Sequence, residues 1–167
     1  MKLKIILALL PAILGAWIGT AWSQSPVALK SDSPINIDSD RFEADHRSKN
    51  LVFTGNVRAT QDEFKINCDT LTAIYKENAK GEKESYSIDR LVAQGRVVII
   101  QKDIVAKSER AEYFNQGQKV ILTGSPEVKQ DKNTVNGQKI TLLLPENKYL
   151  VEGKVKTVIF PQKSGQR

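Results

Sequence analysis

The 167-residue chain has very little of what catalytic and metal-binding sites usually need, with one histidine, one cysteine and one methionine. One cysteine cannot form an internal disulfide, so the fold must be held by its apolar core alone. Because Cys68 alternates with Phe64 and Ile66, we expect it to be a buried core residue rather than a reactive thiol. His46 lies in a polar segment and is expected to be solvated. The sequence therefore predicts that the protein is not an enzyme and needs no cofactor or metal.

Motifs for nucleophilic catalysis and for phosphate binding are also missing from the sequence. Four acidic residues lie close together, but alternation along a strand would divide them between two faces: Asp38, Asp40, Glu43 and Asp45. We interpret them as solvated charges rather than as a calcium site. The net charge of +6 is spread along the chain without a basic cluster interleaved with aromatics, which argues against nucleic acid as a partner. A mild positive excess still suits an anionic partner.

Only one long apolar run is present, at residues 5–20, and it follows a short basic start. Ala21 and Ser23 place small residues before a cleavage site at Gln24, which is typical of a secretory signal peptide. The run is shorter than the ~20 residues of a membrane span, although an uncleaved anchor is the alternative interpretation. We expect a signal peptide at 1–23, a polar lead-in at 24–33, one domain at 34–160 and a flexible tail at 161–167.

A short phrase with a central glycine occurs four times, and the last three glycines are equally spaced. The copies are Phe53-Thr54-Gly55-Asn56-Val57, Ala93-Gln94-Gly95-Arg96-Val97, Leu122-Thr123-Gly124-Ser125-Pro126 and Val151-Glu152-Gly153-Lys154-Val155. A glutamine follows each of the first three glycines at a constant offset, as Gln61, Gln101 and Gln130. A fixed period in this range indicates one supersecondary unit that is stacked on copies of itself around a continuous core.

Each repeat is predicted to form a strand, a turn and a second strand, because apolar and polar residues alternate with a period of two. In the second strand of each unit, an apolar residue stands at the same offset from the repeat glycine, as Leu71, Ala111 and Ile140. Residues 35–42 look like a truncated first unit, and residues 149–159 read as an alternating last strand. The fold class is therefore predicted to be all-β, with stacked antiparallel strands folded over an apolar interior.

Two interruptions of this pattern have local explanations. The charged segment at 77–87 is predicted to be a surface loop insertion, which explains why the first two repeat glycines are further apart than the others. The repeat glycines inside strands are predicted to mark bulges or close approaches of the backbone.

A stack of this kind has two ends, and its first and last strands are predicted to be unpaired edges. These strands lie near residues 35–38 and 155–160. Open edges pair with other chains unless they are blocked, so the ends are candidate sites of self-association. The candidate residues of this oligomer edge are Ile35, Ile37, Val155, Val158 and Ile159.

Three motifs in order resemble the LptA (OstA-type) family of periplasmic lipopolysaccharide transport proteins. They are Pro34-Ile35-Asn36-Ile37-Asp38-Ser39-Asp40, the first repeat phrase with Gln61, and Ile66-Asn67-Cys68-Asp69. Two later segments also match the family pattern: Val120-Ile121-Leu122-Thr123-Gly124 and Gly137-Gln138-Lys139-Ile140-Thr141. The resemblance covers about residues 34–160. It implies a slightly open β-jellyroll in the periplasm, whose apolar groove binds the acyl chains of lipid A.

The resemblance also implies partners and site residues. Family members join end to end and link an LptC-like inner-membrane extractor complex to an LptD-like outer-membrane translocon. Ile35, Ile99 and Tyr113 match groove-lining positions of the family, whereas Asn115 stands where an apolar residue is expected. The full set of candidate lipid-binding residues is Ile35, Ile37, Phe53, Val57, Ile66, Leu71, Ile99, Tyr113 and Leu122.

Other interpretations stay open on the sequence. A membrane-anchored LptC-like adaptor of the same pathway would retain residues 5–20. A glycan-binding or glycan-cleaving β-repeat protein is a second alternative, but a cleaving enzyme should present paired carboxylates at matching repeat positions. The repeats have glycine and apolar residues there instead. A purely structural module without a ligand is the third alternative.

Overall fold

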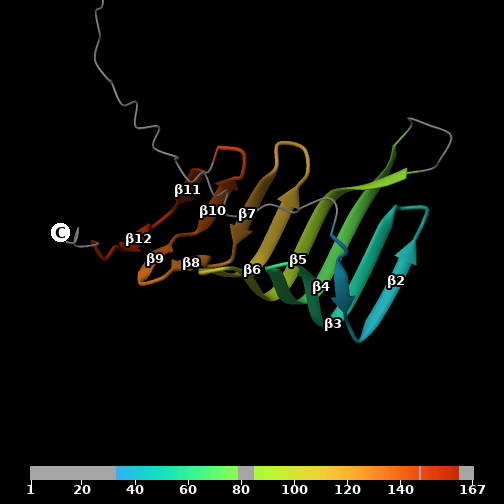
Figure 1. The fold of residues 1–167 in the computed structure, drawn as a ribbon, viewed down its shortest axis with the longest axis horizontal. Helices are drawn as coiled ribbons and strands as arrows, with labels where there is room; N and C mark the ends of the chain where they lie inside the picture. Colours follow the sequence, from blue (N-terminus) through green and yellow to red (C-terminus); the bar gives the residue numbers. More distant parts are fainter. Residues whose placement is uncertain (1–32, 79–84, 147, 162–167) are drawn as a thin grey trace, which may run out of the picture.

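The computed structural model describes residues 33–78, 85–146 and 148–161, and their regular structure is entirely β. The strands are β1 (Asn36–Asp38), β2 (Arg41–Asp45), β3 (Asn50–Gln61), β4 (Phe64–Asn78), β5 (Ser85–Gln101), β6 (Ile104–Phe114), β7 (Lys119–Thr123), β8 (Glu127–Gln130), β9 (Asn133–Asn136), β10 (Lys139–Leu143), β11 (Lys148–Glu152) and β12 (Lys156–Val158). All belong to one antiparallel sheet, which runs from β1 and β2 at one end to β11 and β12 at the other (Figure 1). The described residues contain no helix that could span a membrane.

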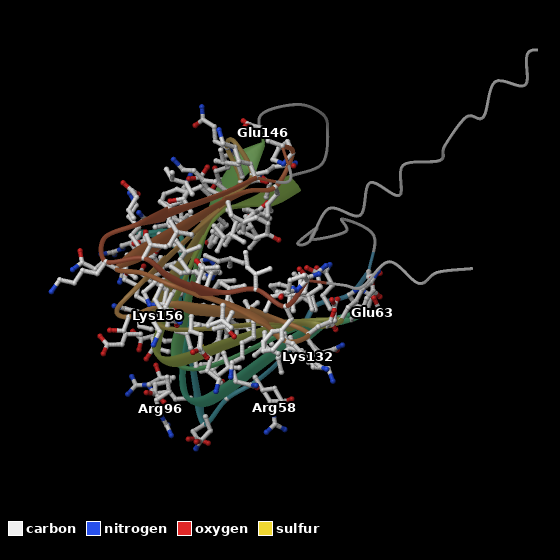
Figure 2. All side chains as sticks on the ribbon, turned by 90° about the vertical axis from the view of Figure 1, so that its left-hand side faces the viewer. Arg58, Glu63, Arg96, Lys132, Glu146 and Lys156 are labelled. Carbon is white, nitrogen blue, oxygen red and sulfur yellow. The ribbon has the colours of Figure 1, made fainter. Side chains whose placement is uncertain are left out.

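The sheet is folded lengthwise into two facing layers (Figure 2). The upper layer contains β2, β7, β10 and β11, and the lower layer contains β1, β8, β9 and β12. The long strands β3, β4, β5 and β6 cross from one layer to the other, which joins the layers along one side. On the open side, Glu146 lies in an upper-layer turn, and Glu63 lies across from it in a lower-layer turn (Figure 2). We name these free margins the upper lip and the lower lip.

The repeat glycines form the corner where the sheet changes layer. Gly55 and Gly95 have positive φ angles of 84° and 75°, and the residue after each also has a positive φ. The strand register shifts at both places, as expected for a bulge. A Cβ atom at Gly95 would lie 2.8 Å from the Cβ atom of Asp69, so the backbones approach too closely for a side chain. The predicted role of these glycines is confirmed.

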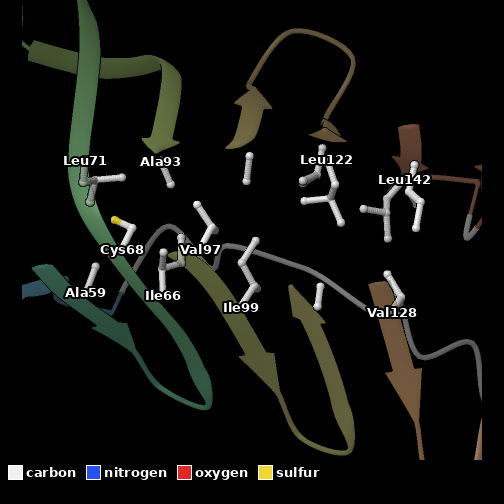
Figure 3. Packing of buried hydrophobic residues seen from close by; sticks show 14 of the residues in the cluster. Ala59, Ile66, Cys68, Leu71, Ala93, Val97, Ile99, Leu122, Val128 and Leu142 are labelled. Atoms are coloured by element: carbon white, nitrogen blue, oxygen red, sulfur yellow. The ribbon is translucent and has the colours of Figure 1, made fainter. Parts of the chain in front are cut away.

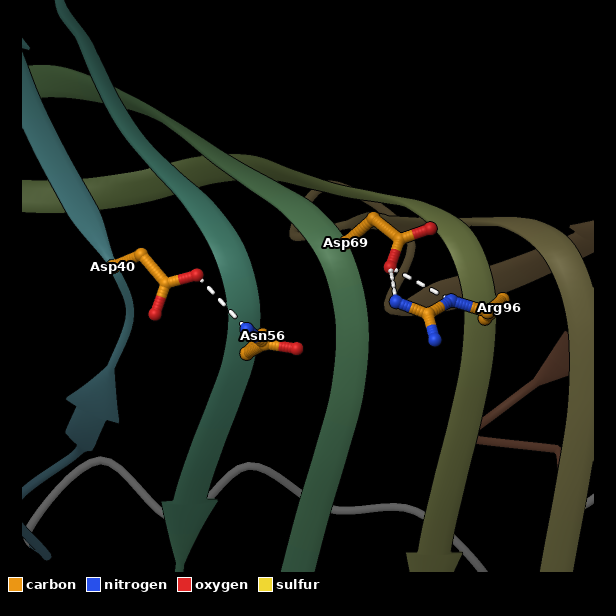
Figure 4. Close-up of polar contacts among 4 residues, drawn as sticks. All are labelled: Asp40, Asn56, Asp69 and Arg96. Carbon is orange, nitrogen blue, oxygen red and sulfur yellow. Dashed lines mark hydrogen bonds and ion pairs between the residues drawn. The ribbon is translucent and has the colours of Figure 1, made fainter.

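Polar side chains hold neighbouring strands together at the corner (Figure 4). Asn56 Nδ2 donates to Asp40 Oδ2 at 2.9 Å, and Arg96 Nε donates to Asp69 Oδ1 at 2.9 Å. The Arg96 hydrogen bond lowers the pKa of the Asp69 carboxyl. These contacts lie on the outer surface, so they position the corner without entering the core.

The apolar core fills the space between the layers, with side chains pointing inward from both (Figure 3). Leu71, Ala111 and Ile140 are all buried, and they lie in one cross-strand row with Ala93 and Leu122 between them. Their shared offset from the repeat glycines therefore reflects one position in the folded unit. Cys68 is also buried in this core, as predicted.

Three predicted segments differ from the structure. Residues 35–42 and 149–159 are not continuous strands, because the corner divides the first into β1 and β2 and the second into β11 and β12. The segment 77–87 is not all loop, because β4 continues to Asn78 and β5 begins at Ser85. Alternation indicates a strand but cannot show that the strand breaks to join two layers. The predicted signal peptide, most of the lead-in and most of the tail lie outside the described residues.

Candidate functional site

The candidate site is the space between the two layers, and the structure brings most of the predicted lipid-binding residues together there. Five are buried in one cluster: Val57, Ile66, Leu71, Ile99 and Leu122. Three are partly buried and pack against it: Ile37, Phe53 and Tyr113. Ile35 precedes β1 and is 48% exposed, so it lies apart from the others. The residues thus form a closed apolar interior, with one member at its end.

This interior is tightly packed in the middle of the sheet. A cavity of about 30 Å³ lies between Phe64 and Ile99 of the lower layer and Leu91 and Tyr113 of the upper layer. Val57, in the lower layer near the corner, is only 1% exposed. A space of this size holds about one water molecule, so the described state has no room for an acyl chain at its centre.

The interior is more open toward its C-terminal end. There, a pocket of about 140 Å³ lies between Tyr149 of the upper layer and Ile104, Gln130 and Ile159 of the lower layer. A second pocket, of about 320 Å³, lies near the other end, but all of its lining residues belong to the upper layer, in the β2–β3 and β4–β5 hairpins. Its lining is mostly apolar or aromatic: His46, Leu51, Tyr75, Tyr86, Ser87 and Ile88. The interior is therefore wider at the C-terminal end than at its packed centre, and the N-terminal end has an apolar pocket on the upper layer.

Tyrosines near the upper lip combine apolar rings with polar ends. The Tyr113 hydroxyl donates to Asn115 Oδ1 at 3.3 Å, and burial raises the pKa of Tyr113. Burial and the negative charge of Asp103 together raise the pKa of Tyr149. Tyr149 also lines one pocket together with Ile104 and Gln130 of the lower layer, so the two lips approach each other at this end. Asn115, the polar exception to the family pattern, is exposed and serves as the partner of the tyrosine hydroxyl.

The repeat glutamines lie along the lower lip, which is the free margin of the lower layer. Cross-strand pairing places them in one continuous row that alternates with other residues, in the order Gln61, Phe64, Gln101, Ile104, Gln130 and Asn133. Each shares its strand face with core residues, so the row faces the interior. The constant spacing of these glutamines from the repeat glycines is the sequence signal that could have predicted this shared location, which was not predicted.

The edge strands place most of the predicted oligomer residues on the surface. Among the described residues, β1 and β2 pair only with β3, β12 pairs only with β9, and β11 pairs only with β10. Val155, Val158 and Ile159 at the C-terminal end are 53%, 43% and 70% exposed. Ile37 is the exception, because it packs partly into the core.

The described residues offer little for catalysis or metal binding. They contain no group of three or more histidine, cysteine or acidic residues that could hold a metal ion. Burial, with a smaller contribution from the charge of Asp69, raises the pKa of the Cys68 thiol to about 11. His46 is exposed, and its Nδ1 lies 3.2 Å from the Tyr75 hydroxyl.

The family model described as LptA/(LptD N-terminal domain) LPS transport protein matches residues 36–148 of this chain. The chain belongs to this family. The lipopolysaccharide export system protein LptA of Escherichia coli K12 is 29% identical over 164 residues, which cover 96% of this chain and 86% of LptA. The export system protein LptH of Pseudomonas aeruginosa is 30% identical over 135 residues, which cover 78% of this chain and 75% of LptH.

A solved structure shows the same fold. The crystal structure of P. aeruginosa LptH, described as the LptA homologous periplasmic component of the lipopolysaccharide transport device, aligns with a TM-score of 0.64 and 22% identity. The alignment covers 77% of this chain and 96% of LptH. The match to the LptA family model runs from β1 to the first residue of β11. It therefore includes the central core and the glutamine row, whereas β12 lies beyond it.

Proposed function

We propose that this chain carries lipopolysaccharide through the periplasm by holding its acyl chains between the two layers while the sugars stay in water. Exposing an acyl chain to water costs ~0.8 kcal/mol per methylene, or roughly 10 kcal/mol for a chain of about a dozen carbons. Such a lipid needs an apolar carrier to leave the membrane. The family, the apolar interior and its wider C-terminal end support this assignment.

The observation that carries the proposal is that the layers are joined along one side only. Among the described residues, no strand of the upper lip pairs with a strand of the lower lip. The packed centre can therefore admit acyl chains when the lips separate, without breaking any backbone pairing within a layer. Apolar side chains that now contact each other across the interior would then contact the lipid.

Site-specific photocrosslinking tests this proposal with neighbouring positions as controls. A photoreactive side chain at Ile99 or Tyr113 faces the interior, whereas one at Ile100 points outward from the same strand as Ile99. We expect adducts with lipopolysaccharide at the two inward positions and none at Ile100. Equal labelling of Ile99 and Ile100, or no adduct at any position, would reject the groove.

We also propose that copies of the chain join end to end. Within the described part of the chain, each layer contains eight strands, the upper one β2, β3, β4, β5, β6, β7, β10 and β11 and the lower one β1, β3, β4, β5, β6, β8, β9 and β12. Because neighbours alternate in direction and eight is even, β11 of one copy can pair antiparallel with β2 of the next. The same holds for β12 and β1. The joining strands also match in length, with five residues in β2 and β11 and three in β1 and β12.

Removal of residues 155–167 tests this arrangement. The described part of this segment is exposed throughout, so the deletion should leave the core folded while removing the edge that meets β1. We expect light scattering to show a monomer at concentrations where the full chain forms larger species. Unchanged oligomers in a folded truncated protein would contradict pairing through β12.

The cellular context follows from the same proposal. The chain would be exported by a signal peptide cleaved near Ser23 and Gln24, and would bridge an LptC-like inner-membrane complex and an LptD-like outer-membrane translocon. Mass spectrometry of the exported protein distinguishes this role from an anchored LptC-like adaptor. A chain starting at Gln24 supports the bridge, whereas retention of residues 5–20 supports the adaptor.

A further inference from the structure

The glutamines along the lower lip are regularly spaced. Neither the corner, the core nor the edge strands explain why glutamine recurs there. Gln61, Gln101 and Gln130 lie on alternate strands of the layer, with Phe64 and Ile104 between them in direct cross-strand register. Neighbouring strands lie about 4.8 Å apart, so consecutive amides are spaced by roughly 10 Å along the sheet. The row thus alternates amide and apolar groups at the margin of the apolar interior.

Two of the three amides, those of Gln61 and Gln101, are placed where polar groups are costly unless they have partners. Gln61 is 7% exposed and its Nε2 donates to the Ser33 carbonyl at 2.9 Å, whereas the Oε1 atom of Gln101 is buried without a hydrogen-bond partner among the described residues. Gln130 is exposed, its Nε2 donates to Asp103 Oδ2 at 3.0 Å, and it also lines the pocket at the C-terminal end. A buried acceptor without a partner destabilises the empty protein, whereas a ligand that donates to it removes this penalty.

We propose that the repeat glutamines bind the junction between the sugar and the acyl chains of the lipid, and so determine how deeply the lipid enters. This inference rests on the proposed function. A carboxamide offers two donors and an acceptor, which match the amide, ester and hydroxyl groups where acyl chains meet a sugar. Phe64 and Ile104 contact the first methylenes below that junction. A simple fatty chain has no such junction and gains nothing from the amides.

The spacing of the row also suits movement along the sheet. The amides are neutral, so each hydrogen bond has a modest net strength and holds the lipid less firmly than an ion pair would. A lipid that leaves one glutamine meets the next amide roughly 10 Å further along. Each step therefore exchanges one weak amide contact for another. A series of weak sites allows the lipid to advance without being trapped at one of them.

Comparison of Gln101→Met with Gln94→Met tests the proposal. Methionine has nearly the length of glutamine but lacks the amide, and Gln94 lies on the same strand with its side chain exposed on the outer face. Binding is measured for purified lipopolysaccharide and for a pyrenyl fatty acid, which has an apolar chain but no sugar linkage. For Gln101→Met we expect lipopolysaccharide to bind about three- to tenfold more weakly, with fatty-acid binding unchanged within about twofold. Gln94→Met should alter neither.

The outcomes separate this inference from the proposed function. Equal weakening of both ligands by Gln101→Met, together with a lower melting temperature, would show that the glutamine only stabilises its turn and would overturn the inference. Unchanged lipopolysaccharide binding in Gln101→Met would overturn it as well. If Gln101→Met fails to fold, Gln130→Met is measured with the same two ligands and the same criteria. Failure of the wild-type protein to bind lipopolysaccharide would overturn the proposed function itself.

Discussion

The middle of the folded sheet and its two ends contain similar apolar residues in opposite environments. Leu122 and Ile140 in the middle are fully buried, whereas Ile159 and Phe160 at the C-terminal end are 70% and 53% exposed. Burial of an aliphatic side chain contributes about 1.5–3 kcal/mol, which the middle gains within one chain and the end can gain only against a partner. The middle therefore stabilises the fold, whereas the apolar side chains of the C-terminal end are available to a partner, as the proposed end-to-end joint requires.

Truncation of a leucine in the middle should give the largest effect. We expect Leu122→Ala to lower the free energy of unfolding by about 2–5 kcal/mol, because the side chain is fully buried between the layers. Ile159→Ala should change it by less than about 0.5 kcal/mol, since most of that side chain is in water. Urea denaturation of monomeric protein measures both. Similar losses for the two variants would remove the distinction between middle and end.

Replacing the glycine at the corner should lower the free energy of unfolding more than replacing a glycine at the open lip. Gly95 and Gly117 have similar φ angles of 75° and 79°, so alanine meets the same backbone strain at both. A Cβ atom at Gly95 would also clash with Asp69, whereas no atom lies within 4 Å of one at Gly117. We expect losses of about 3 kcal/mol for Gly95→Ala and about 1 kcal/mol for Gly117→Ala. Thermal unfolding measures both variants. If the two lose equal free energy of unfolding, the strands at the corner move apart at little cost to accommodate the added Cβ atom.

Much of the middle could be predicted from sequence because its signals are local and repeated. The period of two gives the strands, and the constant offset from the repeat glycines gives a buried row that includes Leu71 and Ile140. The repeat glycines indicate close backbone approach. What they do not show is that each strand bends into a second layer at Gly55 and Gly95, because a bulge within a flat sheet would leave the same sequence pattern.

The site could be predicted only in part, for a physical reason. Alternation shows that Ile99 and Tyr113 face inward, but whether an interior is packed or open depends on the distance between two layers, which no local pattern encodes. The pocket that Tyr149 shares with Ile104 and Gln130 of the lower layer depends on the same distance. The glutamine row was missed because its members are far apart in sequence and meet only through strand register.

The buried thiol gives the middle of the sheet a pH dependence above about pH 9. Burial raises the pKa of Cys68 from 9.0 to about 11, so between these values the unfolded chain loses a proton that the folded chain keeps. Stability due to this group is therefore unaffected below about pH 9 and falls as the pH rises toward 11. Because solvent screens Asp69 at the exposed corner, we expect a loss of about 1 kcal/mol at pH 10.

A matched variant isolates this contribution. Cys68→Val keeps an apolar side chain of similar size and removes the titrating group, so its unfolding free energy should fall less steeply between pH 9 and pH 11. The difference between the two slopes is the prediction, because lysines and tyrosines titrate in both proteins. Parallel curves would indicate that the thiol ionises equally in the folded and unfolded chains.

The two ends differ from each other in charge, and this difference should have the smallest effect. Residues 36–45 at the N-terminal end have four acidic residues and one basic one, a net charge of −3, whereas residues 148–160 have three basic and one acidic, a net charge of +2. Opposite ends therefore attract and like ends repel, which favours head-to-tail joining. Exposed pairs contribute only about 0.2–1 kcal/mol each, so the effect should be a few-fold in affinity and weaker at high salt.

Charge reversal at each end tests this difference. Lys148→Glu with Lys156→Glu should weaken self-association a few-fold in sedimentation at low salt, and Asp38→Lys with Glu43→Lys should do the same. A chain that carries all four substitutions should recover the affinity, because its two reversed ends are again opposite in charge. Recovery in this quadruple variant is the decisive result, since it has no unaltered end, and substitutions that had merely damaged the edge strands would weaken association further when combined. If the quadruple variant associates no better than either double variant, the joint depends on strand pairing and apolar contact, without a contribution from charge.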